Sequence, residues 1–382
     1  MFLKKIEITT WPEKRRSPEG VIKEVLGQKG DKGLDILTII KKFGLPEEFP
    51  EKVLNFADKI EEEIDPKEYK RRTDFRNLRM VTIDGEDAKD LDDAVSIERL
   101  PDGNYKLGVH IADVTHYVKE SNPLDKEALK RGTSVYLIDR VIPMLPKKLS
   151  NGICSLNPKV DRLTLSCIMT IDKNGKILDH EIHEGIIRTN ERMTYTDVTK
   201  ILRDKDEELI KKYDYLYDDF LAMEELANIL NKKRMRRGAI DFDFEEAKIT
   251  LNSLGKPIEI KPYPREIANR IIEEFMLACN ETIAEYMYWT NLPFVYRVHE
   301  NPDEEKLAKF REFIYNLGYT MKWTQDIHPR TLQEVLEKVK GKKEETVVST
   351  LLLRSMMKAR YSPESLGHFG LAARYYCHFT SP

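Results

Sequence analysis

Six of the ten residues from Asp84 to Asp93 carry a carboxylate, and this density restricts the chain more than any other feature. Two unit negative charges about 4 Å apart repel by roughly 4 kcal/mol at an effective dielectric constant of 20, so these groups converge only around a cation. Apolar residues flank the segment, as expected of one that folds inward. Hard carboxylate oxygens suit Mg²⁺ or Mn²⁺, ions that also hold phosphate oxygens. The segment therefore predicts a metal site for phosphodiester chemistry.

The spacing of the acids indicates how this segment must fold. On one extended strand, Asp84 and Asp92 would lie about 26 Å apart at 3.3 Å per residue, too far for one metal centre. We therefore expect a reversal at Gly85, where a positive φ is tolerated, and a loop that enters the next strand at Ala94. A calcium loop of the EF-hand type fails, because Ala88 or Ala94 falls where that pattern requires an acid. An acidic surface loop remains the alternative.

Charge is abundant in the 382 residues but balanced, with 63 basic against 66 acidic side chains and a net charge of −3. This balance excludes a protein that binds nucleic acid by charge alone, since such a protein would be strongly basic. The four cysteines are scattered without a C-x-x-C pair, which favours a reducing compartment and argues against structural zinc. Neither a signal peptide nor a bilayer-spanning run is present, so we expect a protein of the cytoplasm. We also expect a monomer.

The pattern of apolar residues predicts strands in the first half of the chain and helices in the second. An Asn-Gly pair within residues 172–175 indicates a hairpin between the last two of these strands. The expected fold is α+β, with a mixed, largely antiparallel sheet followed by packed helices. Strands are expected at 6–10, 21–26, 93–98, 105–112, 163–171 and 177–187. Helices are expected within 34–63 and at 206–237, 264–289, 303–317, 330–340 and 345–360.

The stretch T-I-D-G-E-D-A-K-D-L-D-D-A resembles the catalytic signature of the ribonuclease II and ribonuclease R family. Further motifs of this family match in order, at 109–118, 131–137, 141–158, 237–242, 271–274, 351–356, 367–372 and 378–382. The resemblance implies three regions along the chain. They are the remnant of a small cold-shock-type β-barrel at 1–30, a helical linker at 31–75, and a ribonuclease II-type catalytic domain at 76–382.

The resemblance also implies an activity. Members of this family are processive, hydrolytic 3′→5′ exoribonucleases that use Mg²⁺ to release nucleoside 5′-monophosphates from single-stranded RNA. By position, the family aspartates that hold metal and the scissile phosphate match Asp84, Asp90, Asp92 and Asp93. Asp92 matches the one on which turnover depends most. Mn²⁺ is the other candidate ion, and we expect no nucleotide cofactor and no membrane partner.

Three further residues are assigned by the same resemblance, and two arginines are candidates because of their position in the chain. The family clamps the 3′-terminal base between two rings, which correspond to Tyr136 and Phe242; otherwise, both would be interpreted as core residues. The I-I-E-E motif carries an active-site glutamate, and helical spacing selects Glu274, at the border of the apolar stripe. An interfacial ion pair is the alternative for this residue. The basic run 232–237 precedes Phe242, so Arg234 and Arg237 are candidates for phosphate contacts.

The chain ends where the family motif continues into a pair of arginines. Further catalytic domain and an S-type barrel normally follow, and cold-shock barrels normally precede. We therefore interpret the chain as an internal fragment of a larger enzyme. A catalytically weak or inactive RNA-binding fragment is the alternative function.

Overall fold

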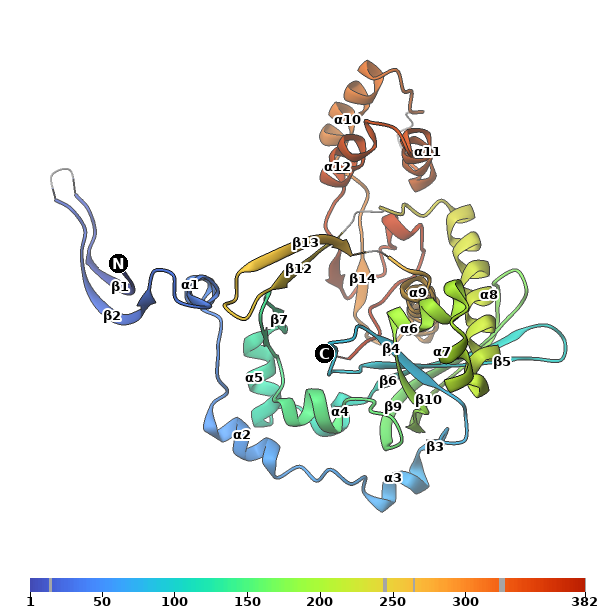
Figure 1. Cartoon of the computed structure of the whole chain (residues 1–382). Helices are drawn as coiled ribbons and strands as arrows, with labels where there is room; N and C mark the ends of the chain where they lie inside the picture. Colours follow the sequence, from blue (N-terminus) through green and yellow to red (C-terminus); the bar gives the residue numbers. More distant parts are fainter. Residues whose placement is uncertain (14–15, 243–245, 264, 323–326, 382) are drawn as a thin grey trace.

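A seven-stranded sheet forms the centre of the molecule, with the strand order β11-β4-β5-β6-β9-β10-β3 (Figure 1). The computed structural model describes residues 1–13, 16–242, 246–263, 265–322 and 327–381. The five central strands pair antiparallel, while β11 and β3 join the two edges in parallel. The predicted mixed, largely antiparallel sheet is therefore confirmed. Its strands are β3 (Thr73–Asp74), β4 (Val81–Asp84), β5 (Asp93–Arg99), β6 (Tyr105–Ala112), β9 (Asp161–Ile171), β10 (Ile177–Arg188) and β11 (Glu191–Thr194).

Alternation along the strands divides the core between the two faces of the sheet. On β4, Val81 and Ile83 point to the face covered by helices α8 (Asp214–Arg237) and α9 (Ile267–Thr290), where Phe220 and Phe275 are fully buried. Successive strand residues face opposite sides, so Asp84 does not point into this core. Burying one such apolar side chain stabilises the fold by about 1.5–3 kcal/mol. Because alternate residues of β4 are buried in this core, the residues between them, including Asp84, lie on the opposite face of the sheet.

The hairpin predicted at the Asn-Gly pair joins β9 to β10. The Asp172 side chain accepts hydrogen bonds at 2.8 Å from the backbone N–H groups of Asn174 and Lys176, which closes the turn. Gly175 has a φ of 78°, in the left-handed region that favours glycine. The prediction of this hairpin from its turn residues is confirmed.

The predicted helices of the second half are present with shifted ends, except that the single helix expected at 206–237 is divided at Tyr213 into two helices. Residue 264, the predicted start of one helix, lies outside the described residues. The last predicted helix ends at Ser355 rather than 360, because β15 (Arg360–Ser362) pairs with β14 (Tyr296–Val298). The helices of this half are α6 (Tyr195–Thr199), α7 (Glu207–Lys212), α8, α9, α10 (Glu304–Asn316), α11 (Pro329–Val339) and α12 (Glu345–Ser355). In Figure 1, α10, α11 and α12 project from the body as a separate group with its own apolar cluster.

The two-stranded ribbon of β12 (Glu246–Leu251) and β13 (Pro257–Tyr263) was not among the predicted elements. Its signal was present, because Ala247, Ile249 and Leu251 alternate with polar residues. The ribbon reaches from the body to the N-terminal region, where the Lys32 ammonium donates to the carbonyl of Ser253 at 2.6 Å (Figure 1).

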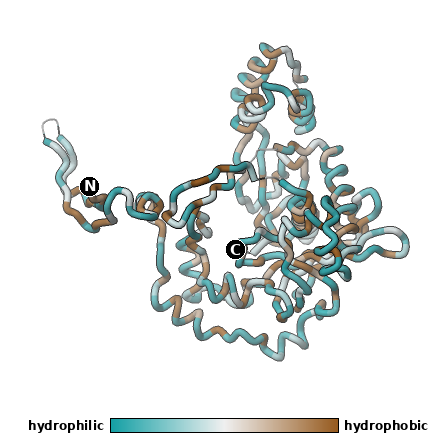
Figure 2. Tube along the Cα trace, viewed as in Figure 1, coloured by the Kyte–Doolittle hydropathy of each residue, from teal (hydrophilic) through white to brown (hydrophobic). Residues whose placement is uncertain are grey.

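The N-terminal region is an arm that extends from the body (Figure 1). The two predicted strands are confirmed as the antiparallel pair β1 (Phe2–Thr10) and β2 (Glu19–Gln28). Apolar side chains on this pair, including Phe2, Ile6 and Val25, are more than half exposed, and Figure 2 shows hydrophobic stretches on the arm. The helices α1 (Leu34–Phe43), α2 (Glu51–Asp58) and α3 (Pro66–Arg71) then lead to the sheet.

Short elements complete the body on the face opposite α8 and α9. They are α4 (Val114–Tyr117), α5 (Pro123–Arg131), the strand pair β7 (Val135–Tyr136) and β8 (Val141–Ile142), and a π-helical segment (Lys148–Ile153). Over the ranges that the structure describes, none of the helices has both the length and the apolar character needed to cross a membrane.

Candidate active site

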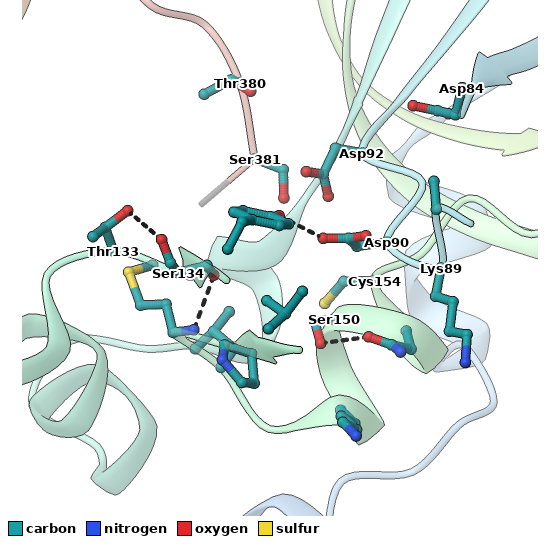
Figure 3. A pocket seen from close by; sticks show the side chains of 18 of the residues that line it. Asp84, Lys89, Asp90, Asp92, Thr133, Ser134, Ser150, Cys154, Thr380 and Ser381 are labelled. Carbon is teal, nitrogen blue, oxygen red and sulfur yellow. Dashed lines mark hydrogen bonds between the residues drawn. The ribbon is translucent and has the colours of Figure 1, made fainter. Parts of the chain in front are cut away.

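A cavity of about 1430 Å³ opens beside the end of β4 and the start of β5. Its walls come from distant parts of the chain: the acidic loop between these strands, the segment that carries β7 and β8, and the last described residues. Figure 3 shows Asp84, Asp90 and Asp92 on one side of the cavity, with Ser381 close to Asp92. The cavity therefore collects most of the predicted metal ligands at one place.

The acidic loop folds back, as the spacing of its acids predicted, but through a different backbone conformation from the one expected. Gly85 does not have a positive φ, so that expectation is wrong. Instead, the chain reverses in a turn in which the N–H of Ala88 donates to the carbonyl of Gly85 at 3.1 Å. The Ser155 hydroxyl then donates to the carbonyl of Lys89 at 3.0 Å and accepts from the N–H of Leu91 at 3.1 Å. These bonds direct the loop into β5.

The four predicted metal ligands do not have equivalent positions. Asp84, Asp90 and Asp92 line the cavity, whereas Asp93 is not among its lining residues. The strand β5 begins at Asp93, the first residue of the predicted strand 93–98, and not at Ala94, so Asp92 and Asp93 face different sides. Asp93 is nevertheless near, because its charge raises the pKa of both Asp84 and Asp92.

Burial and mutual repulsion shift the titration of this group. The pKa of Asp84 is raised to about 7, first by burial and then by the charges of Asp93, Asp92 and Asp90. The pKa of Asp92 is also raised to about 7, by burial and by Asp90, and a hydrogen bond with the Ser381 hydroxyl opposes this shift. Burial raises the pKa of Asp93 to about 6. These carboxylates thus lack sufficient compensating positive charge.

The donor set fits a hard divalent cation. The Oδ2 atom of Asp84 is buried and has no hydrogen-bond partner among the described residues, an unfavourable state that a cation would relieve. In the same described ranges, no group of three or more His, Cys, Asp or Glu side chains is arranged so that it could hold a metal ion by itself. Mg²⁺ typically binds through one or two carboxylates and keeps waters and phosphate oxygens as its other ligands. The cavity fits such an ion and does not form a closed protein cage.

Tyr136 stands at the cavity, where its hydroxyl donates to Oδ2 of Asp90 at 2.9 Å. Its side chain is 67% exposed, so the ring is available to a base. Base–aromatic stacking contributes about 1–3 kcal/mol per base to the binding of single-stranded nucleic acid. The position of Tyr136 is thus compatible with its predicted role.

The C-terminal tail reaches the cavity because helix α9 holds it. The Asn280 side chain accepts from the N–H of Phe379 at 3.0 Å, and it donates to the hydroxyl of Tyr376 at 3.1 Å. Thr380 and Ser381 then line the cavity (Figure 3). Neither residue was among the predicted site residues, although the motif at 378–382 was a signal for them.

The other predicted site residues do not meet at the cavity. Glu274, on α9, is 3% exposed and accepts from the guanidinium of Arg234 at 2.7 Å and from the amide of Asn231 at 2.8 Å. Arg237 donates to Glu281 at 2.6 and 2.7 Å. Phe242 packs against the apolar cluster of α10, α11 and α12. The expected convergence of these four residues on the metal site is therefore not seen, because α8 and α9 pair with each other through these charges.

The surroundings of Glu274 favour the interfacial ion pair over a catalytic role, and this can be tested. Glu274→Leu should lower the free energy of unfolding by about 3 kcal/mol, because it leaves the Arg234 charge buried without its main partner. The double variant Glu274→Leu/Arg234→Met should recover most of that loss. Urea unfolding measures both. Full stability of the single variant, combined with loss of RNA cleavage, would instead support the catalytic assignment.

Comparisons with known proteins agree with this geometry. The RNB domain model matches residues 72–382, and the cold shock domain model matches residues 5–50. Ribonuclease R 1 of Lactococcus lactis is 50% identical over 99% of this chain and 46% of its own length, and ribonuclease R of Thermotoga maritima is 48% identical over 98% and 53%. The chain spans about half the length of these curated relatives. The structure of Mycoplasma genitalium RNase R with ribose-methylated single-stranded RNA aligns with a TM-score of 0.91 at 30% identity, covering 99% of this chain and 58% of that one.

Proposed function

Because this chain belongs to the RNB domain family, we propose that it is the catalytic region of a 3′→5′ exoribonuclease. It hydrolyses single-stranded RNA processively and releases nucleoside 5′-monophosphates. In this proposal the catalytic domain occupies 76–382, after a cold-shock-type remnant at 1–30 and a helical linker at 31–75. The names of the curated relatives and the RNA bound by the Mycoplasma genitalium neighbour support it.

One observation carries the proposal: three aspartates line a cavity together with an exposed ring, and one of them has a buried oxygen without a hydrogen-bond partner among the residues that the structure describes. A protein that only binds RNA gains nothing from carboxylates that repel phosphate. Asp84, Asp90 and Asp92 would hold Mg²⁺ or Mn²⁺, with Asp93 beside them. When bound, the metal supplies an activated water and neutralises the charge that develops on the phosphate.

The residues of the chain would perform the remaining tasks. The Tyr136 ring would stack on the base near the 3′ end, while its hydroxyl keeps the Asp90 carboxylate in place. Ser381, through its hydrogen bond with Asp92, would orient that carboxylate. The cavity exceeds the roughly 300–1,000 Å³ of a small-molecule site, which suits the end of a polymer.

The metal requirement tests this function directly. With oligo(A) labelled at its 3′ end, the chain should release labelled mononucleotide in Mg²⁺ and release none in EDTA. Excess Mg²⁺ or Mn²⁺ should restore the release. Oligo(A) labelled at its 5′ end should keep its label and become shorter from its 3′ end. Gel electrophoresis with mononucleotide standards identifies the products. Binding of the RNA without metal-dependent shortening would instead support the alternative, a catalytically inactive RNA-binding fragment.

A further inference from the structure

Arg192 lies in β11, directly beside the strand that leads into the acidic loop. The parallel register places Arg192 opposite Thr82, and Thr194 opposite Asp84. Met193 is buried in the core that also contains Val81 and Ile83. Because strand residues alternate, Arg192 lies on the other face of the sheet, the same face as Asp84. It is also one of the residues that line the cavity.

The guanidinium of Arg192 binds the turn that reverses the acidic loop. Its Nη2 atom donates to the carbonyl oxygens of Gly85 at 3.2 Å, Glu86 at 2.7 Å and Ala88 at 2.8 Å. An Nη2 atom has two hydrogens, so one is shared between two carbonyls. The Nε atom is buried and has no partner within the described ranges. One charged nitrogen therefore gathers three backbone carbonyls of a single turn.

We propose that Arg192 is a positioning residue of the metal site, an inference that rests on the proposed function. By gathering the three carbonyls, it keeps the loop reversed so that Asp84, Asp90 and Asp92 face one cavity. Its charge also lies near Asp84 and offsets part of the repulsion within the acidic group. Arg192 acts through the loop that carries the metal ligands, in the way that outer-shell groups orient the ligands of other metal sites.

The other contacts of the acidic loop predict which part of the loop would lose its fixed conformation without Arg192. Ser155 holds the loop at Lys89 and Leu91, after the turn. The Thr196 hydroxyl donates to the Glu86 carboxylate. This bond joins two side chains and does not hold the backbone of the turn. Apart from the bond between the Ala88 N–H and the Gly85 carbonyl within the turn, the backbone of 85–88 is held by Arg192, whereas the entry into β5 is held by Ser155. Loss of these bonds should increase the mobility of the turn without unfolding the domain.

The test compares Arg192→Met with Arg192→Lys in the full chain. Arg192→Met should weaken Mn²⁺ binding in the absence of RNA by about 10- to 100-fold, the range found when outer-shell partners are removed. Amide hydrogen exchange should accelerate over 85–88 and stay unchanged in the sheet. Arg192→Lys keeps the charge and presents three donors on one nitrogen, so it should recover most of the affinity. Electron paramagnetic resonance of Mn²⁺ and mass-spectrometric exchange give the two readouts.

Arg79→Met is the matched control. Arg79 pairs with Asp219 at 2.8 Å, precedes β4 and does not line the cavity, so its loss removes the same charge without touching the loop. Unchanged Mn²⁺ affinity and exchange in Arg192→Met would overturn the proposal, as would an equal effect of Arg79→Met. If Arg192→Met does not fold, Arg192→Gln replaces it, with the same expected results. Both readouts work without RNA cleavage, so an inactive wild-type chain would contradict the proposed function and leave this inference testable.

Discussion

Replacing Asp92 with asparagine should reduce mononucleotide release at least about a hundredfold, because the loss of outer-shell partners alone costs up to that factor in other metal sites. Asparagine keeps the size of the side chain and removes its charge. Asp92 lines the cavity beside Asp90, and the Ser381 hydroxyl bonds to it. RNA affinity should be unchanged, because the exposed Tyr136 ring and the rest of the cavity remain. Single-turnover cleavage in Mg²⁺ and fluorescence anisotropy in EDTA measure the two quantities.

Asp87→Asn provides the control for this experiment. Asp87 belongs to the same loop, lines the same cavity and is exposed, so its substitution removes an equal charge from a position with no predicted metal role. It should retain nearly all activity. Normal cleavage by Asp92→Asn would show that the assignment of the metal ligands is wrong. An equal loss in both variants would show that only the total charge of the loop matters.

The metal-free chain should be stabilised by Asp84→Asn at high pH and unaffected at low pH. Raising one carboxyl pKa from 3.8 to about 7 corresponds to about 4 kcal/mol. Below about pH 3 the carboxyl is largely protonated in both the folded and unfolded states, so the two proteins should be nearly equally stable. Above about pH 7 it is ionised in both states, and the folded wild type then carries the full cost of the buried charge. Asparagine has no charge at either pH.

Urea unfolding in EDTA at about pH 3 and about pH 8 measures this difference. Comparing variant with wild type cancels the contribution of buried histidines such as His110, whose pKa is lowered to about 3 by burial. Saturating Mg²⁺ at pH 8 should reverse the order, because an ion that binds only the folded wild type stabilises it. A variant that is less stable than wild type at pH 8 in EDTA would contradict the predicted cost of burying the ionised Asp84 carboxylate.

The acidic loop and the general architecture follow from local patterns. Repulsion between carboxylates and the span of an extended strand were enough to predict that the loop between Asp84 and Asp93 doubles back. Alternation and turn residues were enough to predict the antiparallel strands and the hairpin at Gly175. These features depend on neighbours in the chain, and so a short window of residues contains their cause.

The interaction partners of the charged side chains could not be predicted from such short windows of sequence. Helical spacing placed Glu274 at the border of a buried stripe, but its pairing with Arg234 depends on how α8 lies against α9. No pattern in the sequence singled out Arg192, yet its guanidinium binds the carbonyl of Glu86, 106 positions earlier. Phe379 is held by Asn280 across 99 positions. Short-range patterns show where a charge is placed in its own element, whereas its partner follows from the packing of elements distant in the chain.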